Sequence, residues 1–394
     1  MRRKTIEVHV GNLPMGGDNP IRVQSMTTCP TTDTEGCIAQ IKRIVDAGGE
    51  YVRLTTQGIR EAENLKNIRE GLLRDGYNVP LIADVHFNAK VADVAALYAD
   101  KVRINPGNYI DPARKFKHID YTDEEYQEEI KKLEARFISF LNICKEHHTA
   151  IRIGVNHGSL SDRIMSRYGD TPEGMVESCM EFLRVCVKEN FTDVVISIKA
   201  SNTNVMVTTV RLLVKTMDEA DMHFPLHLGV TEAGEGEDGR LKSAVGIGSL
   251  LVDGIGDTIR VSLSEAPEKE IPVAFGILQA AGARITKTEF ISCPGCGRTL
   301  YNLEETIAKI KKAFAEFEKE QAANPSNKSP KALKIAIMGC IVNGPGEMAD
   351  ADYGYVGAAR GKVSLYKQKQ CIEMNIPEEE AVERLISFIK QDLK

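Results

Sequence analysis

The sequence lacks the features that mark membrane proteins, exported proteins and nucleic-acid-binding proteins. No apolar run among its 394 residues approaches the ~20 residues that a membrane helix needs. Residues 1–7 contain no apolar stretch of signal-peptide length. The formal net charge is −6, from 50 basic and 56 acidic residues. We therefore expect no membrane span, no export signal, and no nucleic acid as the main partner.

The chain also lacks an even set of cysteines. It has nine, an odd number for a chain without an export signal. This count predicts a reducing cytoplasm, in which thiols stay free or bind metal. Cys144, Cys179 and Cys186 fall in helical patterns and are expected in the core. The length and a hydrophobic content of 42% allow two domains with a real core.

Eight short β-rich runs alternate with amphipathic helical stretches between residue 20 and about residue 265. The runs are 21–24, 51–54, 81–84, 101–104, 150–153, 193–197, 225–228 and 258–261. This alternation indicates parallel strands joined by crossover helices. Eight units over ~250 residues predict an α/β fold of the (β/α)₈ TIM-barrel type. A doubly wound open sheet remains the alternative, because a sequence does not show closure.

The pattern changes after about residue 285. The remaining segments predict strands at 286–291, 333–338 and 362–366, and helices at 303–323 and 377–393. This mixture indicates a small α+β domain. We therefore expect a barrel domain over residues 1–282 and a second domain over residues 283–394.

The second domain carries three cysteines and a glutamate in two short motifs. Cys293 and Cys296 lie in SCPGCG, and Cys340 opens CIVNGPGE, which ends at Glu347. Three thiolates suit an iron–sulfur cluster, which normally takes four sulfur ligands. A missing fourth cysteine leaves one iron for a harder or exchangeable ligand. A zinc site, a redox pair or plain buried thiols remain open, although no histidine follows His227.

Polar side chains gather where the predicted strands run into the loops that follow them. They are Arg53, Asp84, His86, Asn105, Arg152, Asn156, Lys199, His227, Glu232, Arg260 and Ser262. Four of them are cations, and a closed barrel brings its strand ends to one mouth. Such a mouth favours a dense anion such as a diphosphate, which arginine grips with two hydrogen bonds. The alternative is that each cation pairs privately with a neighbouring carboxylate.

Two loops border this predicted mouth. Residues 105–122 carry Arg114, Lys115 and Lys117 and form either a lid over an anion or a solvated insertion. Residues 229–239 are rich in glycine but acidic, so they are a poor phosphate cradle. We expect this second loop to be flexible and to present Glu232 to the mouth.

Six motifs together resemble the 4-hydroxy-3-methylbut-2-enyl diphosphate synthases, the family of the penultimate step of non-mevalonate isoprenoid biosynthesis. They are VQSMT at 23–27, ADVHF at 83–87, RINPGN at 103–108, LGVTEAG at 228–234, SCPGCGR at 292–298 and NGPGE at 343–347. The resemblance runs over nearly the whole chain. It implies an oxidoreductase that opens and reduces 2-C-methyl-D-erythritol 2,4-cyclodiphosphate with two electrons and loss of water.

The resemblance also implies roles for individual residues. A [4Fe–4S] cluster would be held by Cys293, Cys296, Cys340 and Glu347, with Glu347 giving way when the substrate oxygen reaches the iron. The diphosphate would be held by Arg53, Arg152, Asn156, Lys199, Arg260 and Ser262. Asp84, His86 and Asn105 would line the mouth, and Glu232 would donate a proton. Electrons would come from reduced ferredoxin or flavodoxin. Two rivals stay open, namely another iron–sulfur reductase or hydro-lyase of a phosphorylated small molecule, and a non-catalytic zinc-containing barrel protein.

One departure from the family pattern concerns the junction of the two domains. Residues 156–163 resemble the group of this family that carries an extra domain between barrel and cluster domain, yet residues 277–284 run straight into the cysteine domain. The last barrel helix, at about 268–279, should end at the face opposite the mouth. Residues 280–285 span at most ~20 Å, and a strand alone is ~17–20 Å long. The short linker therefore predicts a head-to-tail homodimer in which each cluster domain caps the partner's barrel.

Overall fold

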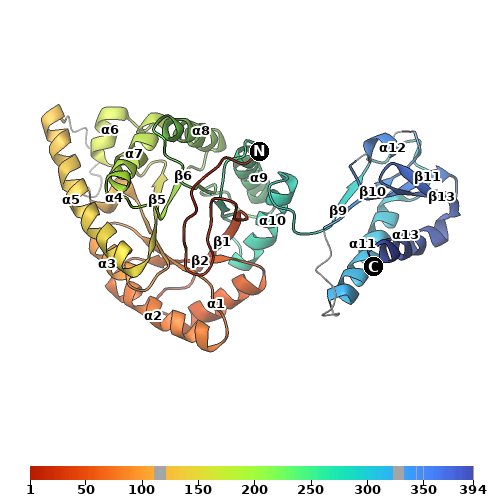
Figure 1. Cartoon of the computed structure of the whole chain (residues 1–394), viewed down its shortest axis with the longest axis horizontal. Coiled ribbons are helices and arrows are strands. Elements are labelled where there is room, and N and C mark those ends of the chain that lie inside the picture. Colours follow the sequence, from red (N-terminus) through yellow and green to blue (C-terminus); the bar gives the residue numbers. More distant parts are fainter. Residues whose placement is uncertain (111–120, 323–331, 343, 349, 394) are drawn as a thin grey trace. The chain divides into compact units, whose positions relative to one another are not determined.

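A computed structural model of the chain describes residues 1–110, 121–322, 332–342, 344–348 and 350–393 (Figure 1). The chain divides into two compact units, Met1–Arg284 and Ile285–Lys394. The basic residues of the suggested lid, Arg114, Lys115 and Lys117, lie outside the described residues.

The first unit is built on eight parallel strands. They are β1 (Arg22–Met26), β2 (Tyr51–Thr56), β3 (Leu81–Val85), β4 (Lys101–Ile104), β5 (Ala150–Asn156), β6 (Val194–Lys199), β7 (His227–Leu228) and β8 (Thr258–Ile259). Their order in the sheet is β6-β5-β4-β3-β2-β1-β8-β7. A parallel bridge between Ile196 and Leu226 joins β6 to the segment that leads into β7. The edges of the sheet therefore meet, and the predicted TIM barrel is confirmed.

Helices cover the outside of these strands (Figure 1). They are α1 (Thr34–Asp46), α2 (Ile59–Arg74), α3 (Ala89–Ala96), α4 (Pro106–Tyr109), α5 (Asp123–His147), α6 (Asp162–Tyr168), α7 (Pro172–Lys188), α8 (Thr203–Glu219), α9 (Gly236–Val252), the 3₁₀ turn η1 (Pro267–Lys269) and α10 (Glu270–Ala280). Side-chain caps fix several starts. Asp33 accepts from the Gly36 N–H ahead of α1, and Thr122 and Glu125 form a capping box at α5.

The N-terminal segment closes the barrel at the end where the strands begin. Val8 and Met15 form an antiparallel bridge. Both pack in one buried cluster with Tyr51 and Ala150, the first residues of β2 and β5. The sequence analysis assigned no element to this segment. Apolar side chains thus fill most of this end, where the buried Lys101 Nζ lies 3.9 Å from Met15 Sδ and over the Tyr51 ring.

The second unit is a mixed α+β domain, as predicted. Its elements are β9 (Glu289–Ser292), α11 (Leu303–Ala322), β10 (Lys334–Met338), α12 (Gly344–Glu347), β11 (Tyr353–Ala359), β12 (Lys362–Lys367), β13 (Gln370–Pro377) and α13 (Glu378–Asp392). The sheet order is β13-β12-β11-β10-β9. Strands β9, β10 and β11 pair in parallel, whereas β12 pairs antiparallel with β11 and β13. A core cluster joins the sheet to α11 and α13.

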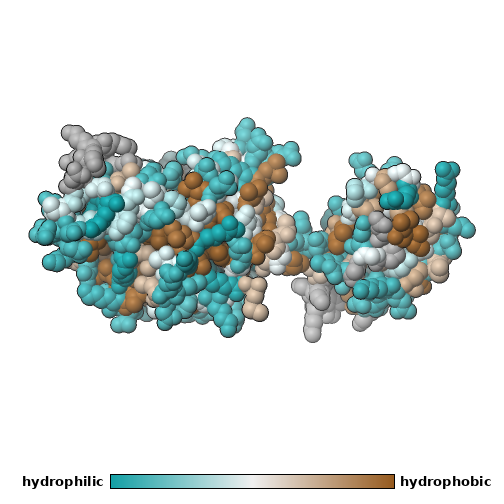
Figure 2. Space-filling model, turned by 90° about the horizontal axis from the view of Figure 1, so that it is seen from above, coloured by the Kyte–Doolittle hydropathy of each residue, from teal (hydrophilic) through white to brown (hydrophobic). Residues whose placement is uncertain are grey.

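The face of the molecule shown in Figure 2 is mixed in hydropathy. On the face shown in Figure 2, hydrophilic residues surround smaller apolar areas on the barrel unit. Among the helices that the structure describes, none is long and apolar enough to cross a bilayer.

Candidate active site

Five cations line the barrel interior. Arg53, Arg103 and Arg152 are each the third residue of their strand, so Arg53 and Arg152 lie deeper than the sequence analysis expected, whereas Lys199 ends its strand. Arg53, Arg103, Arg152 and Lys199 project from β2, β4, β5 and β6, and each is at most 9% exposed. Arg260 directly follows β8. Arg103 and Arg152 are register partners on neighbouring strands. The barrel therefore brings together the four cations that the sequence analysis named, and adds Arg103.

Asp84 on β3 is the carboxylate shared by three of its neighbours. Arg103 Nη1 donates to Asp84 Oδ1 over 3.0 Å, and Arg53 Nε lies 3.6 Å from Oδ2. His86 Nε2 lies 3.6 Å from Oδ1 and also contacts Arg103 Nη1. Burial alone would raise the pKa of Asp84, but the charges of Arg53 and Arg103 hold that pKa well below its usual range. Asp84 is therefore ionised, and its carboxylate is paired with Arg53 and Arg103.

Arg260 has a carboxylate of its own, so the private-pairing alternative holds for this cation. Its Nη2 lies 3.1 Å from Glu270 Oε1, and its Nε donates to Oε2 over 3.2 Å. Glu270 is buried and also accepts from the Ser25 hydroxyl (2.7 Å) and the Leu263 N–H (3.2 Å). The thioether of Met26 connects this pair to its neighbour, because its Sδ lies 3.4 Å from Arg260 Nη1 and 2.9 Å from Arg53 Nη2.

Arg152 and Lys199 have no such carboxylate in the described part of the chain. The Nε and Nη1 atoms of Arg152 are buried without a hydrogen-bond partner there. Burial lowers the pKa of Arg152 and of Lys199 well below their usual ranges, and the charges of the neighbouring arginines lower both further. The same causes lower the pKa of Arg53 to about 10 despite its contact with Asp84. Five cations thus face two carboxylates, and the excess positive charge is what an anion site requires.

His227 lies in the same polar interior, on β7. It is 1% exposed, and neither ring nitrogen has a partner among the described residues. Burial lowers its pKa well below the usual range, and the charges of Lys199 and Arg152 lower it further. This histidine is therefore neutral.

The Asn105 side chain forms hydrogen bonds within and between two loops in this structure. Its side-chain oxygen accepts from the Gly107 N–H (3.1 Å) and caps α4, and its nitrogen donates to Ser159 Oγ (2.8 Å). The residue is 1% exposed. It therefore ties the loop after β4 to the loop after β5. A direct contact with substrate stays a prediction.

Three further predicted residues lie at or beyond strand ends, and one of them, Asn156, is the register partner of Lys199. Asn156 ends β5 and Ser262 lies just beyond β8, and both are partly exposed. Glu232 follows β7 in an exposed loop, with φ at +54°. Its carbonyl accepts from Lys242 Nζ over 3.1 Å. Their assignment to the site stays a prediction.

The sequence analysis missed Arg103, Met26 and Glu270. A signal existed for Arg103, because it alternates with Lys101 on a strand whose next polar residue was already assigned to the mouth. None existed for Glu270, which is one of several acidic residues at a helix start.

Two of the predicted cluster ligands follow neighbouring parallel strands of the second unit. Cys293 comes directly after β9 and Cys340 lies two residues after β10, and these strands pair with Ser292 opposite Ile337. The Gly339 N–H donates to Cys293 Sγ over 3.2 Å. Both thiols therefore lie at one edge of the sheet.

The other two predicted ligands are exposed. A backbone hydrogen bond at Arg298, with the charge of that residue and the Thr299 hydroxyl, lowers the pKa of Cys296 and so favours its thiolate. Glu347 ends α12, the short helix that follows Cys340 in the chain. Within the described ranges, no three His, Cys, Asp or Glu side chains lie close enough together to hold a metal ion.

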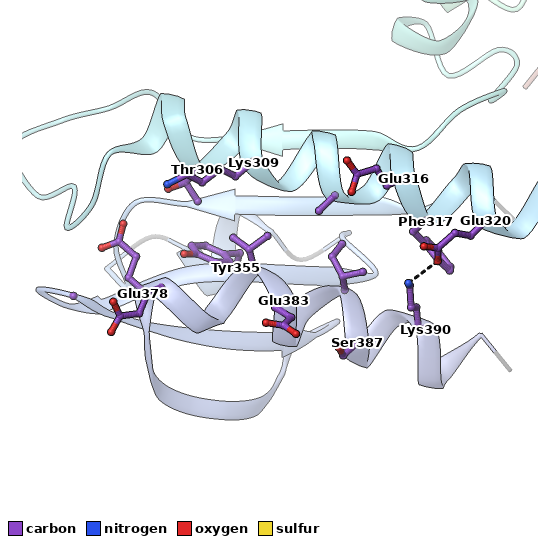
Figure 3. A pocket seen from close by; sticks show the side chains of 15 residues that line it. Thr306, Lys309, Glu316, Phe317, Glu320, Tyr355, Glu378, Glu383, Ser387 and Lys390 are labelled. Atoms are coloured by element: carbon purple, nitrogen blue, oxygen red, sulfur yellow. Dashed lines mark hydrogen bonds and ion pairs between the residues drawn. The ribbon is translucent and has the colours of Figure 1, made fainter.

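A large cavity of the second unit has the wrong charge for an anionic substrate. It has a volume of about 920 Å³ and lies between α11 and α13, above Tyr355 (Figure 3). Its charged lining residues are Glu316, Glu320, Glu378, Glu379 and Glu383 against Lys309 and Lys390. Lys390 pairs with Glu320 over 2.7 Å. The barrel interior, and not this groove, carries the unpaired positive charge.

Comparison with known families matches both units. The family model of the GcpE TIM-barrel domain matches residues 5–275, and that of the GcpE protein C-terminal domain matches residues 289–391.

The chain also aligns with relatives of two lengths. A 4-hydroxy-3-methylbut-2-en-1-yl diphosphate synthase (flavodoxin) from Bacteroides fragilis is 47% identical over 611 aligned positions, covering 99% of this chain and 96% of the relative. That alignment is far longer than the 394 residues of this chain, so the relative carries a long segment that is missing here. The ferredoxin-type synthase of Gloeothece citriformis is 51% identical over 392 positions, covering 99% of this chain and 93% of the relative. The chain therefore belongs to the GcpE family, the 4-hydroxy-3-methylbut-2-en-1-yl diphosphate synthases.

Proposed function

We propose that the barrel cations of this chain hold the diphosphate of 2-C-methyl-D-erythritol 2,4-cyclodiphosphate while its ring is opened and reduced. The conversion to 4-hydroxy-3-methylbut-2-enyl diphosphate consumes two electrons and two protons and releases one water. One carbon–oxygen bond to the diphosphate breaks, and the diphosphate stays on the product. The protein must therefore bind the diphosphate throughout and deliver protons and electrons at the other end of the substrate.

The excess of buried positive charge carries this proposal. Arg53 and Arg103 share Asp84, and Arg260 is paired with Glu270, whereas Arg152 and Lys199 lack a described carboxylate partner. Buried cations without partners are costly unless a ligand compensates them. We assign the diphosphate to Arg53, Arg103, Arg152, Asn156, Lys199, Arg260 and Ser262. Asp84, His86 and Asn105 then line and shape the mouth.

We assign a [4Fe–4S] cluster to Cys293, Cys296, Cys340 and Glu347. The donor set fits, because two of the thiols follow neighbouring strand ends and a lowered pKa favours the thiolate of Cys296. The Gly339 N–H at Cys293 Sγ is the kind of hydrogen bond that tunes such a cluster. When bound, the cluster supplies electrons one at a time to the substrate. Glu347 is a harder ligand than a thiolate and is therefore the one that exchanges.

The remaining roles concern protons and electrons. We assign to Glu232 the proton that the departing oxygen takes up, because it lies in an exposed loop after β7 on the mouth side of the barrel. Reduced ferredoxin or flavodoxin supplies the electrons, as the names of both kinds of relative indicate. The nine described cysteines are all free, in keeping with a reducing cytoplasm.

The test is an iron count coupled to turnover. Protein purified without oxygen should hold about four irons per chain and convert the cyclic diphosphate. Cys340→Ser should lose both iron and activity. Cys371→Ser is the matched control, since Cys371 lies on β13 of the same unit and outside the ligand set. Stoichiometric zinc without iron, or equal iron in both variants, would overturn the assignment.

We further propose that the active form is a head-to-tail homodimer. Arg284, the last residue of the barrel unit, pairs with Glu50 (2.6 Å) and donates to the Ile21 carbonyl (2.7 Å). Those two residues directly precede β2 and β1, so the barrel unit ends on the side away from the mouth. Only residues 285–288 separate this point from β9, and they span at most ~14 Å. This linker is shorter than one strand of ~17–20 Å, which favours a second chain as the source of the cysteine unit.

Complementation tests the dimer. Cys340→Ser and Arg152→Met chains are mixed under conditions that allow subunit exchange. A heterodimer contains one barrel with Arg152 that is served by an intact cysteine unit, so a fraction of activity should return. A mixture of Cys340→Ser with Cys296→Ser is the control and should stay inactive. No recovery despite proven exchange, or a fully active monomer, would show that one chain completes its own site.

A further inference from the structure

Two cysteines outside the proposed cluster site lie next to each other at the mouth end of the barrel. Cys29 lies in the loop that follows β1, and Cys37 lies in the first half of α1. Their sulfur atoms are 3.3 Å apart. Cys37 is fully buried, whereas Cys29 is partly exposed between the exposed residues Thr28 and Pro30. One thiol of the pair is therefore open to a reagent in solution, and the second lies directly behind it.

We propose that Cys29 and Cys37 are a thiol–disulfide modification site whose oxidation weakens the anion site of the barrel. The oxidant is a disulfide, either a small one such as oxidised glutathione or that of a dithiol protein. Cys29 attacks it, which forms a mixed disulfide and releases one thiol. Cys37 then attacks Cys29 Sγ and releases the second thiol. Two protein thiols lose two electrons and two protons, and the reagent gains them as two thiols.

The order of attack follows from burial. Burial raises the pKa of Cys37 far above its usual range, and the neighbouring Cys29 raises it further. Cys37 is thus a poor nucleophile toward solvent and reacts only with a sulfur already held beside it. Cys29 provides that sulfur from the exposed side.

Bond formation must move the loop after β1. A disulfide requires the sulfurs to approach to about 2.05 Å, well inside their present 3.3 Å separation. Gln40 now holds the loop, since its Oε1 accepts from the Thr28 N–H (2.7 Å) and from Cys29 Sγ (3.4 Å). Its Nε2 donates to the Thr28 hydroxyl (2.8 Å). Oxidation removes the thiol donor and draws Cys29 toward α1.

This loop is joined to the cations of the anion site. Cys29 is three residues from Met26, whose Sδ contacts both Arg53 and Arg260. The N–H of Thr27, between them, donates to the Arg53 carbonyl over 2.9 Å. A displacement of residues 27–29 therefore shifts the side chain that links two diphosphate-binding arginines. This part of the inference rests on the proposed function.

Peptide mapping tests the modification independently of that function. The holoenzyme is equilibrated without oxygen in buffers of reduced and oxidised glutathione, quenched in acid, alkylated and digested with trypsin. Residues 23–42 contain no internal lysine or arginine, so one peptide carries both cysteines. In oxidising buffer it should lose two hydrogens and escape alkylation, and dithiothreitol should reverse this. A peptide that stays doubly alkylated at every ratio would overturn the proposal and leave only two thiols in contact.

The effect on the anion site is measured as the dissociation constant for the cyclic diphosphate. Oxidation should raise it about tenfold, the order expected when hydrogen bonds to charged groups are weakened. Cys29→Ser, which lacks the attacking thiol, should bind as tightly as the reduced wild type and ignore glutathione, whereas Cys371→Ser should still respond. The iron content of each sample separates this effect from cluster damage. An oxidised peptide with unchanged affinity would refute the coupling, and no affinity in reduced protein would refute the proposed function instead.

Discussion

Replacing Arg152 or Arg260 by methionine should have opposite effects on stability, although both substitutions should weaken substrate binding. Arg152 is 1% exposed, and two of its nitrogens have no partner in the described chain. The Arg260 side chain is 14% exposed and is held by Glu270, whose side chain is 2% exposed. Both arginines are assigned to the diphosphate, so both variants should lose affinity.

The magnitudes follow from what each substitution leaves behind. Arg260→Met leaves Glu270 as a buried carboxylate without its cation, which lowers the free energy of unfolding by about 3–5 kcal/mol. Arg152→Met removes a buried cation that lowers the pKa of its neighbours, and it leaves no carboxylate unpaired. It should therefore raise the free energy of unfolding by ~1 kcal/mol or more. For a unit of this size, about 2 °C of melting temperature corresponds to 1 kcal/mol. Arg260→Met should then melt roughly 6–10 °C lower than wild type, and Arg152→Met about 2 °C higher.

The assay is thermal unfolding of anaerobically purified protein with and without the cyclic diphosphate. At one hundred times its dissociation constant, a ligand stabilises the native state by ~2.7 kcal/mol, or about 5 °C here. The wild type should show this shift, and both variants should lose most of it. Destabilisation of equal size in both variants would refute the distinction between paired and unpaired cations. A full ligand shift in Arg152→Met would remove this residue from the anion site.

Three further outcomes are expected. Burial and the nearby arginines depress the pKa of Lys199, and a bound diphosphate should raise that pKa again. Binding should therefore take up a proton and weaken as pH rises. Calorimetry in two buffers of different ionisation enthalpy measures the proton uptake, and an absence of uptake would contradict the assignment. Asn105→Ala should lower the free energy of unfolding, measured in urea, by ~1 kcal/mol. Asn105→Ser still caps α4 and should lower it less, and equal losses in the two variants would contradict the capping role. Glu347→Gln should lower the iron content or the turnover without changing the melting temperature of the barrel. A change in that melting temperature would instead indicate a structural role for Glu347.

Periodicity and strand-end chemistry were enough to predict the barrel. Each of the eight β-rich runs overlaps an observed strand, because buried parallel strands read as short apolar runs between helical patterns. The parallel arrangement then directs Arg53, Arg152 and Lys199 into one barrel interior without any knowledge of the loops. Only Lys199 ends its strand, because β2 and β5 run further than the predicted runs and leave Arg53 and Arg152 inside them.

Segments without a pattern of their own were not predictable. Residues 1–20 form no regular element, and the bridge between Val8 and Met15 exists because the open end of the barrel offers an apolar surface to cover. Strands β11 and β13 were missed. The first contains two glycines, and the second is an edge strand with polar residues, so neither reads as a buried run. Pairing with β12 decides their structure.

The same limit applies to charges, and it explains why the site could be predicted only in outline. A sequence shows that cations stand at strand ends, but it does not show which of them the protein neutralises. The fold gives Arg260 a carboxylate from the next helix and gives Arg53 and Arg103 one carboxylate to share. It leaves Arg152 and Lys199 buried without a carboxylate partner in the described structure. The paired cations hold the walls of the site in place without a ligand, whereas the unpaired cations attract a diphosphate. The unpaired cations therefore lower the stability of the free barrel, and the same residues should bind the substrate most strongly.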